Sequence, residues 1–291
     1  EQDLSQISAS IAKSKKVVLV TGAGISCNAG IPDFRSASGY YSLAQNQFSD
    51  MKLKGKDFFD AIIFNSPRTT QAFFTFIANM RSCMLEACPT PTHQFVRQLK
   101  DSKRLLRCYT QNIDGLESQI GLTIGTTKES DVVQLHGDIH KLKCMSCFEQ
   151  FSWTASHIES IYSNELPLCP SCAVRAYERE QAGKRNLGVG VLRPDIVLYG
   201  EDHPHGSEIG NCAANDIKSG PDCLIIAGTS LKVKGIKQLV RAAAKKVHEL
   251  GGVVILVNVG TVSYSAWKDV IDYHVIADCD NWVADLLQRQ P

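Results

Sequence analysis

The chain has 291 residues, a net charge of +1 and 44% hydrophobic residues. This length predicts one or two domains, and the mix of apolar and charged residues excludes wholesale disorder. A net charge near zero argues against a protein that binds nucleic acid through phosphate contacts alone. No apolar run approaches the roughly 18 residues of a membrane span, so no membrane-spanning segment is expected. The first residues lack the basic and apolar regions of a signal peptide.

The elements expected in chain order begin with a helix over residues 3–14. An apolar, β-branched run then predicts a buried strand over 16–20, which runs into a loop at Thr21-Gly22. Residues 37–92 are rich in Phe among polar spacers and look helical and irregular. From residue 104 onward the strand pattern returns. The predicted strands are 105–110, 132–135, 196–199, 224–227, 253–257 and 274–277.

The fold class follows from the character of these strands. Several are continuous apolar runs, which is typical of parallel strands covered on both faces. Between two of them, apolar residues recur at helical spacing over 236–250, and Gly251-Gly252 is expected to end that helix. The pattern predicts a doubly wound, mostly parallel α/β sheet. We expect this Rossmann-like domain over 1–36, 93–136 and 188–291, a helical module over 37–92 and a zinc-binding module over 137–187.

The metal signal comes from two CxxC pairs, Cys144/Cys147 and Cys169/Cys172. Each pair offers two thiolates from one tight turn, and four thiolates satisfy a tetrahedral zinc ion. Because four protein ligands close the site, the zinc should be structural. A redox-active CxxC is the alternative. The chain has eleven cysteines, an odd number, which favours metal binding in a reducing compartment over a disulfide framework.

A glycine-containing loop, Gly22-Ala23-Gly24-Ile25-Ser26-Cys27, follows the first strand. Glycines there let the backbone turn tightly and approach a pyrophosphate. The third glycine of the dinucleotide-binding fingerprint is absent, and no second strand supplies the usual acidic residue. A Rossmann dehydrogenase is therefore disfavoured, and a simple tight turn is the alternative interpretation.

Three polar segments share a position at or just beyond predicted strand ends: 30–35, 110–115 and 136–138. In an open α/β sheet, ligands bind beyond the carboxyl ends of strands, so these segments are expected to converge on one crevice. The third segment supplies His136, whose ordinary pKa suits proton transfer at neutral pH. A purely structural role for this histidine is the alternative.

Together these motifs resemble a family, the sirtuins. GAGISCNAGIPDFR (22–35), TQNIDGL (110–116), HGD (136–138) and the paired CxxC occur in the family's order, and GTS (228–230), VNVG (257–260) and ADCD (277–280) continue it. The resemblance covers nearly the whole chain. CYTQNIDGLE and RPDIVLYGEDHPHG look most like fungal nuclear sirtuins that deacetylate the core of histone H3.

The resemblance implies an NAD-dependent protein-lysine deacetylase of the nucleus, with the cytoplasm as a second location and NAD consumed as co-substrate. It implies catalytic roles for His136, as general base, and for Asn112. The implied cofactor-binding residues are Gly22, Ala23, Gly24, Ser26, Ile31, Asp33, Phe34, Arg35, Gln111, Asn112, Ile113, Asp114, Gly228, Thr229, Ser230, Asn258 and Cys279. The implied substrate contacts are Val197, Tyr199, Gly200, Glu201 and Val233, where an added strand of substrate would pair with the backbone.

Two departures from the family pattern bear on specificity. Tyr199 stands where many relatives have Phe, and Val259-Gly260 replaces a polar or acidic pair. Relatives that remove acidic acyl groups pair a Tyr with a nearby Arg; Tyr40 here is followed by no such Arg, so acetyl is expected over succinyl.

Two other functions remain as alternatives: mono-ADP-ribosyl transfer and a non-catalytic, zinc-containing chromatin scaffold. The basic run from Lys232 to Lys246 is interpreted as the solvated face of its helix, with contact to chromatin or nucleotide phosphates as the alternative. The expected partners are an acetylated histone or other protein lysine, and chromatin. No membrane partner is expected. The oligomeric state stays open.

Overall fold

A computed structural model describes residues 2–289 of the chain. Its largest sheet has six strands, all parallel, in the order β3-β2-β1-β7-β8-β9. The strands are β1 (Val17–Thr21), β2 (Leu105–Thr110), β3 (Val132–Gln134), β7 (Cys223–Ala227), β8 (Val253–Val257) and β9 (Tyr273–Val275). The order reverses at β1, so the sheet is doubly wound and has a crevice beyond the ends of β1 and β7.

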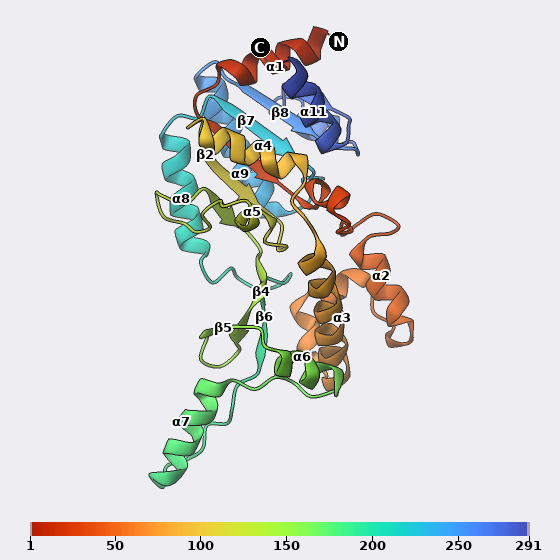
Figure 1. Cartoon of the computed structure of the whole chain (residues 1–291), viewed down its shortest axis with the longest axis vertical. Helices are drawn as coiled ribbons and strands as arrows, with labels where there is room; N and C mark the ends of the chain where they lie inside the picture. The colour runs from red at the N-terminus through yellow and green to blue at the C-terminus, as the bar shows by residue number, and fades with distance from the viewer. Residues whose placement is uncertain (1, 290–291) are drawn as a thin grey trace.

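Helices cover both faces of this sheet, as the continuous apolar strands require (Figure 1). Alternate strand residues such as Leu19, Ile225 and Ile255 pack against α1 (Gln2–Lys13), α4 (Pro91–Asp101) and α11 (Cys279–Arg289). The intervening residues, such as Val20 and Ile226, pack on the other face against α8 (Gly206–Lys218), α9 (Lys234–Glu249) and the short α10 (Tyr264–Trp267). Gly251 takes φ +70° directly after α9, as the expected left-handed cap does.

The Phe-rich region forms a helical module beside the sheet. It contains α2 (Tyr40–Gln47), three short 3₁₀ turns and α3 (Pro67–Glu86). Phe58, Phe73 and Phe74 are fully buried in one aromatic cluster there. Figure 1 shows α2 and α3 below the six-stranded sheet, at the level of β4 and β6 of the second, smaller sheet.

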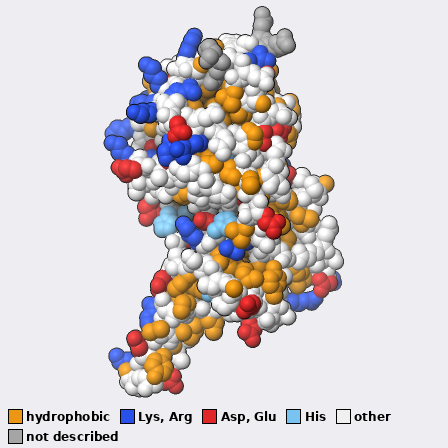
Figure 2. All heavy atoms as spheres, viewed as in Figure 1, with side chains coloured by type: hydrophobic (Ala, Val, Ile, Leu, Met, Phe, Trp, Pro, Cys, Tyr) orange, Lys and Arg blue, Asp and Glu red, His pale blue; other side chains and the backbone are white. Residues whose placement is uncertain are grey.

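A second, antiparallel sheet has three strands in the order β5-β4-β6. They are β4 (Gly137–Cys144), β5 (Gln150–Ser152) and β6 (Leu192–Ile196), accompanied by α6 (Ala155–Tyr162) and the projecting α7 (Pro170–Gln181) (Figure 1). Figure 2 shows hydrophobic side chains spread over the end of the molecule that carries the small sheet. Lys and Arg side chains gather at the opposite end, which carries the large sheet.

The prediction of a strand at 196–199 is wrong. The strand ends at Ile196, begins at Leu192 and belongs to the small antiparallel sheet rather than to the parallel one. The apolar run 196–199 was ambiguous because its backbone pairs with two different partners, although Ile196, Leu198 and Tyr199 all pack in the aromatic cluster of the helical module. The Ile196 backbone pairs with Gly137 in the small sheet, whereas the Tyr199 backbone bonds to residues 59 and 61. Pro194 fits an edge strand, because it has no N–H to donate.

The other predicted strands are confirmed to within a residue or two at their ends, as are the leading helix and the helix over 236–250. The α/β class with a smaller sheet that carries the cysteines is also confirmed. The division into three domains stays a proposal; its first residue and last two residues lie outside the described part. Within residues 2–289, no helix has the length and hydropathy of a membrane span.

Candidate functional site

The loops that follow β1 and β7 touch through their backbones. The amide of Gly24 donates to the carbonyl of Gly228 over 2.9 Å, and Gly22 donates to Ala227 over 3.0 Å. A Cβ added at Gly24 would lie 2.7 Å from the Gly228 Cα, and Gly228 itself has φ +64°. These contacts explain why glycine is needed at both loops: any side chain would push apart the two backbones that form this edge of the crevice.

Behind this loop lies a buried polar centre. The Ser26 hydroxyl donates to Asp114 over 2.7 Å, and the Asn112 side-chain amide donates to Ser26 over 3.1 Å. Asp114 also accepts from the backbone of Leu116. The Asn112 side-chain oxygen is buried and has no partner among the described residues. Such an oxygen is costly to leave unbonded, so it marks a position where a ligand would be bound.

His136 follows β3 and is oriented by one hydrogen bond. Its Nδ1 lies 2.9 Å from the carbonyl of Gln111, and a carbonyl only accepts, so Nδ1 carries the proton. Burial lowers the pKa of His136 below its ordinary 6.5, and the neighbouring His203 and Arg35 lower it further, although the Gln111 carbonyl opposes them. The imidazole is therefore neutral at pH 7, and its Nε2 lone pair is available to accept a proton.

These groups surround one cavity of about 680 Å³. The cavity joins the glycine loops, the polar centre, His136 and the segment after β6. The sequence-predicted residues that line it are Gly22, Ala23, Gly24, Asp33, Phe34, Arg35, Gln111, Asn112, Ile113, His136, Val197, Tyr199, Gly200, Glu201, Gly228, Thr229, Ser230, Val233, Asn258 and Cys279. Ser26, Ile31 and Asp114 do not line it. Ser26 and Asp114 support its wall from behind.

Sequence reasoning missed several lining residues, among them Cys27, Tyr41, Phe59, Leu135 and His203. Phe59 and Tyr41 come from the helical module, which carries no motif. His203 stands within the quoted RPDIVLYGEDHPHG segment, so its nearness to the predicted substrate residues was the available signal.

Three polar side chains meet at the mouth of the helical module. The Tyr199 hydroxyl lies 3.0 Å from the Arg35 guanidinium and 3.2 Å from the Tyr41 hydroxyl. Lys56 lies 4.5 Å from the centroid of the Tyr199 ring. Tyr40, by contrast, is buried against Phe34 and Phe76, away from the cavity. The hydroxyl that distinguishes Tyr199 from Phe thus connects the loop 31–38 to the segment after β6.

The backbone of the segment 197–201 is hydrogen-bonded to neighbouring elements and to its own Glu201, whose carboxylate accepts from the Leu198 amide over 3.0 Å. The Tyr199 amide donates to Phe59 over 2.7 Å, and its carbonyl accepts from Ala61 over 2.9 Å. The Val197 amide donates to the carbonyl of His136. The Gly200 amide makes no hydrogen bond within the described residues, and Val233 lies across the cavity at the start of α9.

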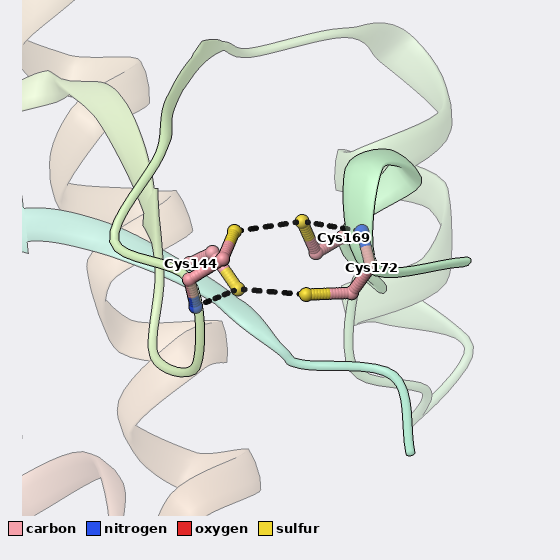
Figure 3. A group of neighbouring side chains, drawn as sticks. Cys144, Cys169 and Cys172 are labelled. Atoms are coloured by element: carbon pink, nitrogen blue, oxygen red, sulfur yellow. Dashed lines mark hydrogen bonds between the residues drawn. The ribbon is translucent and has the colours of Figure 1, made fainter. Parts of the chain in front are cut away.

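The four predicted zinc ligands converge. The thiol sulfurs of Cys144, Cys147, Cys169 and Cys172 all lie within 4.8 Å of one another. Cys144–Cys172 and Cys147–Cys169 are 3.8 and 3.7 Å apart, and a tetrahedron with Zn–S bonds of about 2.3 Å needs edges of about 3.8 Å. Backbone amides of Ser146 and Cys147 point at the Cys144 sulfur, which suits a thiolate. Figure 3 shows Cys144 facing Cys169 and Cys172 across the site. The donor set therefore fits zinc.

One buried acid near the site was not singled out from the sequence. Glu117, in α5 (Leu116–Gln119), is 1% exposed, and neither of its carboxylate oxygens has a partner among the described residues. Burial raises the pKa of Glu117 to about 8, and the charge of Asp114 adds to the shift. Glu117 is therefore mostly protonated at neutral pH, so the polar centre carries less negative charge than its composition suggests.

Comparison with known proteins places these features in context. The model of the Sir2 family matches residues 22–235. The chain is 45% identical over 308 residues to the NAD-dependent histone deacetylase HST3 of Saccharomyces cerevisiae, covering 100% of this chain and 69% of that protein. It is 46% identical over 297 residues to HST3 of Candida albicans, covering 97% of this chain and 61% of that protein.

Among solved structures, a Sir2 complex described as "Sir2-p53 peptide-NAD+" superposes with a TM-score of 0.70 at 25% identity. The match covers 99% of this chain and 95% of that one. The agreement over almost the full length supports the arrangement of the large sheet, the helical module and the small sheet described above. The chain spans only about two thirds of the length of the curated relatives that it matches.

Proposed function

The chain belongs to the Sir2 family, and from this premise we propose that it is an NAD-dependent protein-lysine deacetylase that releases nicotinamide and acetyl-ADP-ribose. The observation that carries the proposal is the placement of His136. Its neutral imidazole, with Nε2 unprotonated, lines the same cavity as the glycine loops and the segment 197–201. A base is thereby held where a nucleotide and an acyl-lysine would meet.

The cavity suits NAD as the co-substrate. The glycines let the two loop backbones pack together at the cavity wall, where their exposed backbone would approach phosphates, and the partnerless oxygen of Asn112 offers an acceptor to a carboxamide. When bound, NAD supplies an electrophilic ribose carbon and a leaving group. Ser26 and Asp114 hold Asn112 in place, Thr229 and Gln111 bond to each other over 3.0 Å at the wall, and His136 takes a proton from a ribose hydroxyl.

We assign the acyl-lysine to the segment 197–201 and to Val233. Pairing of substrate backbone with this segment would grip main chain and therefore select weakly for sequence. The relatives are named histone deacetylases, so we propose histone H3 as substrate and the nucleus as location. Zinc takes no part in the chemistry here; four thiolates leave it no open position.

The direct test is incubation of an acetylated H3 peptide with the chain and NAD. Nicotinamide and acetyl-ADP-ribose are the expected products, identified by mass. Release of nicotinamide with ADP-ribosylated protein would instead indicate ADP-ribosyl transfer, and no nicotinamide at all would indicate a scaffold. A panel of acetylated histone peptides and nucleosomes would rank substrates, and a faster rate on succinyl-lysine would overturn the expected preference for acetyl.

His136→Ala should lower kcat by about 10²–10⁴-fold without changing the melting temperature. His157→Ala, which lies on α6 away from the cavity, is the matched control and should keep full activity. Because the pKa of His136 is lowered, its neutral form persists down to below pH 6.5, so the rate should fall only below that pH. A decline in rate that begins above pH 7 as the pH is lowered would contradict His136 as the base.

A further inference from the structure

The helix α9 carries an unusual stretch of charge. Residues 232–248 contain six Lys and Arg and no Asp or Glu. Of the chain's 31 basic and 30 acidic residues, 25 basic and all 30 acidic residues therefore lie elsewhere, where the net charge is −5. The overall charge of +1 hides this separation, so a net charge near zero does not exclude phosphate contacts by this helix.

The cations share one face. Lys234, Lys237, Arg241 and Lys245 follow one another at spacings of three or four residues, which places them in one stripe along the 16-residue helix. All four are exposed, while Ile236, Val240, Ala243, Ala244 and Val247 on the opposite side are buried against the sheet. The stripe is thus an outward-facing row of positive charge, in which Arg241 also donates to the Ala266 carbonyl over 3.0 Å and lies 4.8 Å from the centroid of the Trp267 ring.

This arrangement is unfavourable for the isolated chain in two ways. Lys237, Arg241 and Lys245 are like charges four residues apart, which repel each other in a helix. Lys234 and Lys237 also lie in the first turn, where the helix dipole disfavours cations. A helix face that served only solubility would mix both signs. Within residues 2–289, the side chains of Lys234, Lys237 and Lys245 form no salt bridge or hydrogen bond, so a polyanion is the partner whose charge would offset both costs.

The stripe also starts at the proposed active site. Val233 and Gly235 line the cavity on either side of Lys234 in sequence, and Ser230 lines it a few residues earlier. A protein segment that enters the cavity would therefore have its flanking material next to α9. If the substrate is a histone, that material includes DNA; this placement rests on the proposed function.

We propose that the face of α9 formed by Lys234, Lys237, Arg241 and Lys245 binds the phosphate backbone of double-stranded DNA. Lysine side chains contact phosphates as point charges and carry no sequence information. The binding should therefore be independent of DNA sequence, and it should weaken steeply with salt because each neutralised phosphate releases a counterion.

The test measures binding of the chain to a fluorescent 30-base-pair duplex by anisotropy across a range of salt concentrations, without NAD or acetyl-lysine. The variant Lys234→Gln/Lys237→Gln/Lys245→Gln should bind at least tenfold more weakly at 100 mM salt. Its slope of log K against log salt should be shallower by about 2 to 3, since each phosphate contact contributes about 0.9. Glutamine has a helix propensity close to that of lysine, so the melting temperature should be retained.

The matched control is Lys13→Gln/Lys128→Gln/Lys184→Gln, which removes three exposed charges scattered over other elements. Equal weakening in both triple variants would mean that only net charge matters, and would overturn the proposal. Absence of salt-dependent DNA binding by the unchanged chain would also overturn it. Stronger binding to polyglutamate than to DNA would do so as well, because it would indicate an acidic protein as the partner.

A second measurement separates this proposal from the proposed function. The α9 triple variant should keep its kcat/KM on a free acetylated peptide but lose rate on an acetylated nucleosome. DNA binding without any deacetylation would refute the function and leave this proposal standing. Deacetylation of nucleosomes at equal rates by the variant and the unchanged chain would refute the DNA surface alone.

Discussion

The large sheet and the small sheet of this molecule are stabilised in different ways. The large sheet buries apolar side chains on both faces, in two extensive clusters. The small sheet divides its buried residues. Ile139 and Ile196 pack in the aromatic cluster of the helical module, whereas the cysteine-bearing part has a core of five residues, Leu142, Cys144, Cys169, Cys172 and Leu192. That five-residue core removes little apolar surface from water, so metal–thiolate bonds are expected to supply most of the stability of the cysteine-bearing part.

The active site depends on both the large sheet and the small sheet. β4 begins directly after His136, and β6 ends directly before Val197. The Val197 amide also donates to the His136 carbonyl over 3.0 Å. The base and the substrate segment are thus fixed at the end of the small sheet, while the glycine loops are fixed at the end of the large one. Loss of either region should abolish activity for a different reason.

Removal of the metal should have the largest effect. Structural zinc sites of this type contribute about 10 kcal/mol or more of apparent binding free energy, so a strong chelator should release about one zinc per chain and unfold the small sheet. Hydrogen exchange should show loss of amide protection in β4 and retained protection in β1, β7 and β8. Cys144→Ala/Cys172→Ala should reproduce this result. A metal-free sample with protected β4 amides and full activity would contradict the assigned role of the metal.

A core truncation in the large sheet should come next. Ile225 is fully buried in β7 between β1 and β8, so Ile225→Ala should lower the free energy of unfolding by about 3–4 kcal/mol. Chemical denaturation measures this loss in the free energy of unfolding. Leu142→Ala, equally buried in the small sheet, should cost less while zinc is bound. Ile62→Ala, at a side chain 48% exposed, is the control and should change stability by less than about 1 kcal/mol. Equal losses in the free energy of unfolding for Ile225→Ala and Leu142→Ala would contradict the difference between the two sheets.

Glu117 should make stability depend on pH. Its folded pKa of about 8 exceeds its unfolded value of 4.5, so between these pH values the unfolded chain has lost a proton that the folded chain retains. Stability therefore falls as the pH rises from 4.5 to 8. Glu117→Gln removes that fall and should stabilise the protein by about 2 kcal/mol at pH 8, with a much smaller difference at pH 5.

Melting curves at the two pH values test this prediction. The exposed Glu129→Gln is the control and should show no comparable difference between pH 5 and pH 8. If Glu117→Gln were equally stabilising at both pH values, the effect would come from packing rather than from ionisation.

The smallest effect is expected at the contact between the two halves of the site. Tyr199→Phe removes the hydroxyl that bonds to Arg35 and Tyr41, leaving the half-buried ring in place. Stability should change by about 1 kcal/mol or less, while KM for NAD should shift a few-fold because the loop carrying Arg35 is freed. Steady-state kinetics measure this shift, and Tyr264→Phe, at a side chain 81% exposed, is the control. An unchanged KM for NAD with a changed kcat would argue against this role.

The accuracy of the sequence-based predictions differs between the large sheet, the cysteine site and the segment 196–199. The strands 105–110 and 253–257 were predicted to the residue. Residues 253–257 form a continuous apolar run, which is typical of a strand in a sheet covered on both sides. The convergence of the four cysteines was predicted because two CxxC pairs supply the four thiolates that a tetrahedral zinc ion needs. The run at 196–199 failed because a short apolar segment does not specify which partner buries it.

The fold class, the cysteine site and the polar segments at strand ends follow from the sequence, since each of these depends on local spacing along the chain. Contacts in the folded chain set the tautomer of His136, bring Tyr41 rather than Tyr40 to the cavity, and bury Glu117 without a partner among residues 2–289. The tertiary structure also showed that the near-neutral charge noted at the outset includes a cationic stripe beside the cavity. Those properties depend on contacts between segments far apart in sequence, whose burial and charge set each pKa and each hydrogen bond.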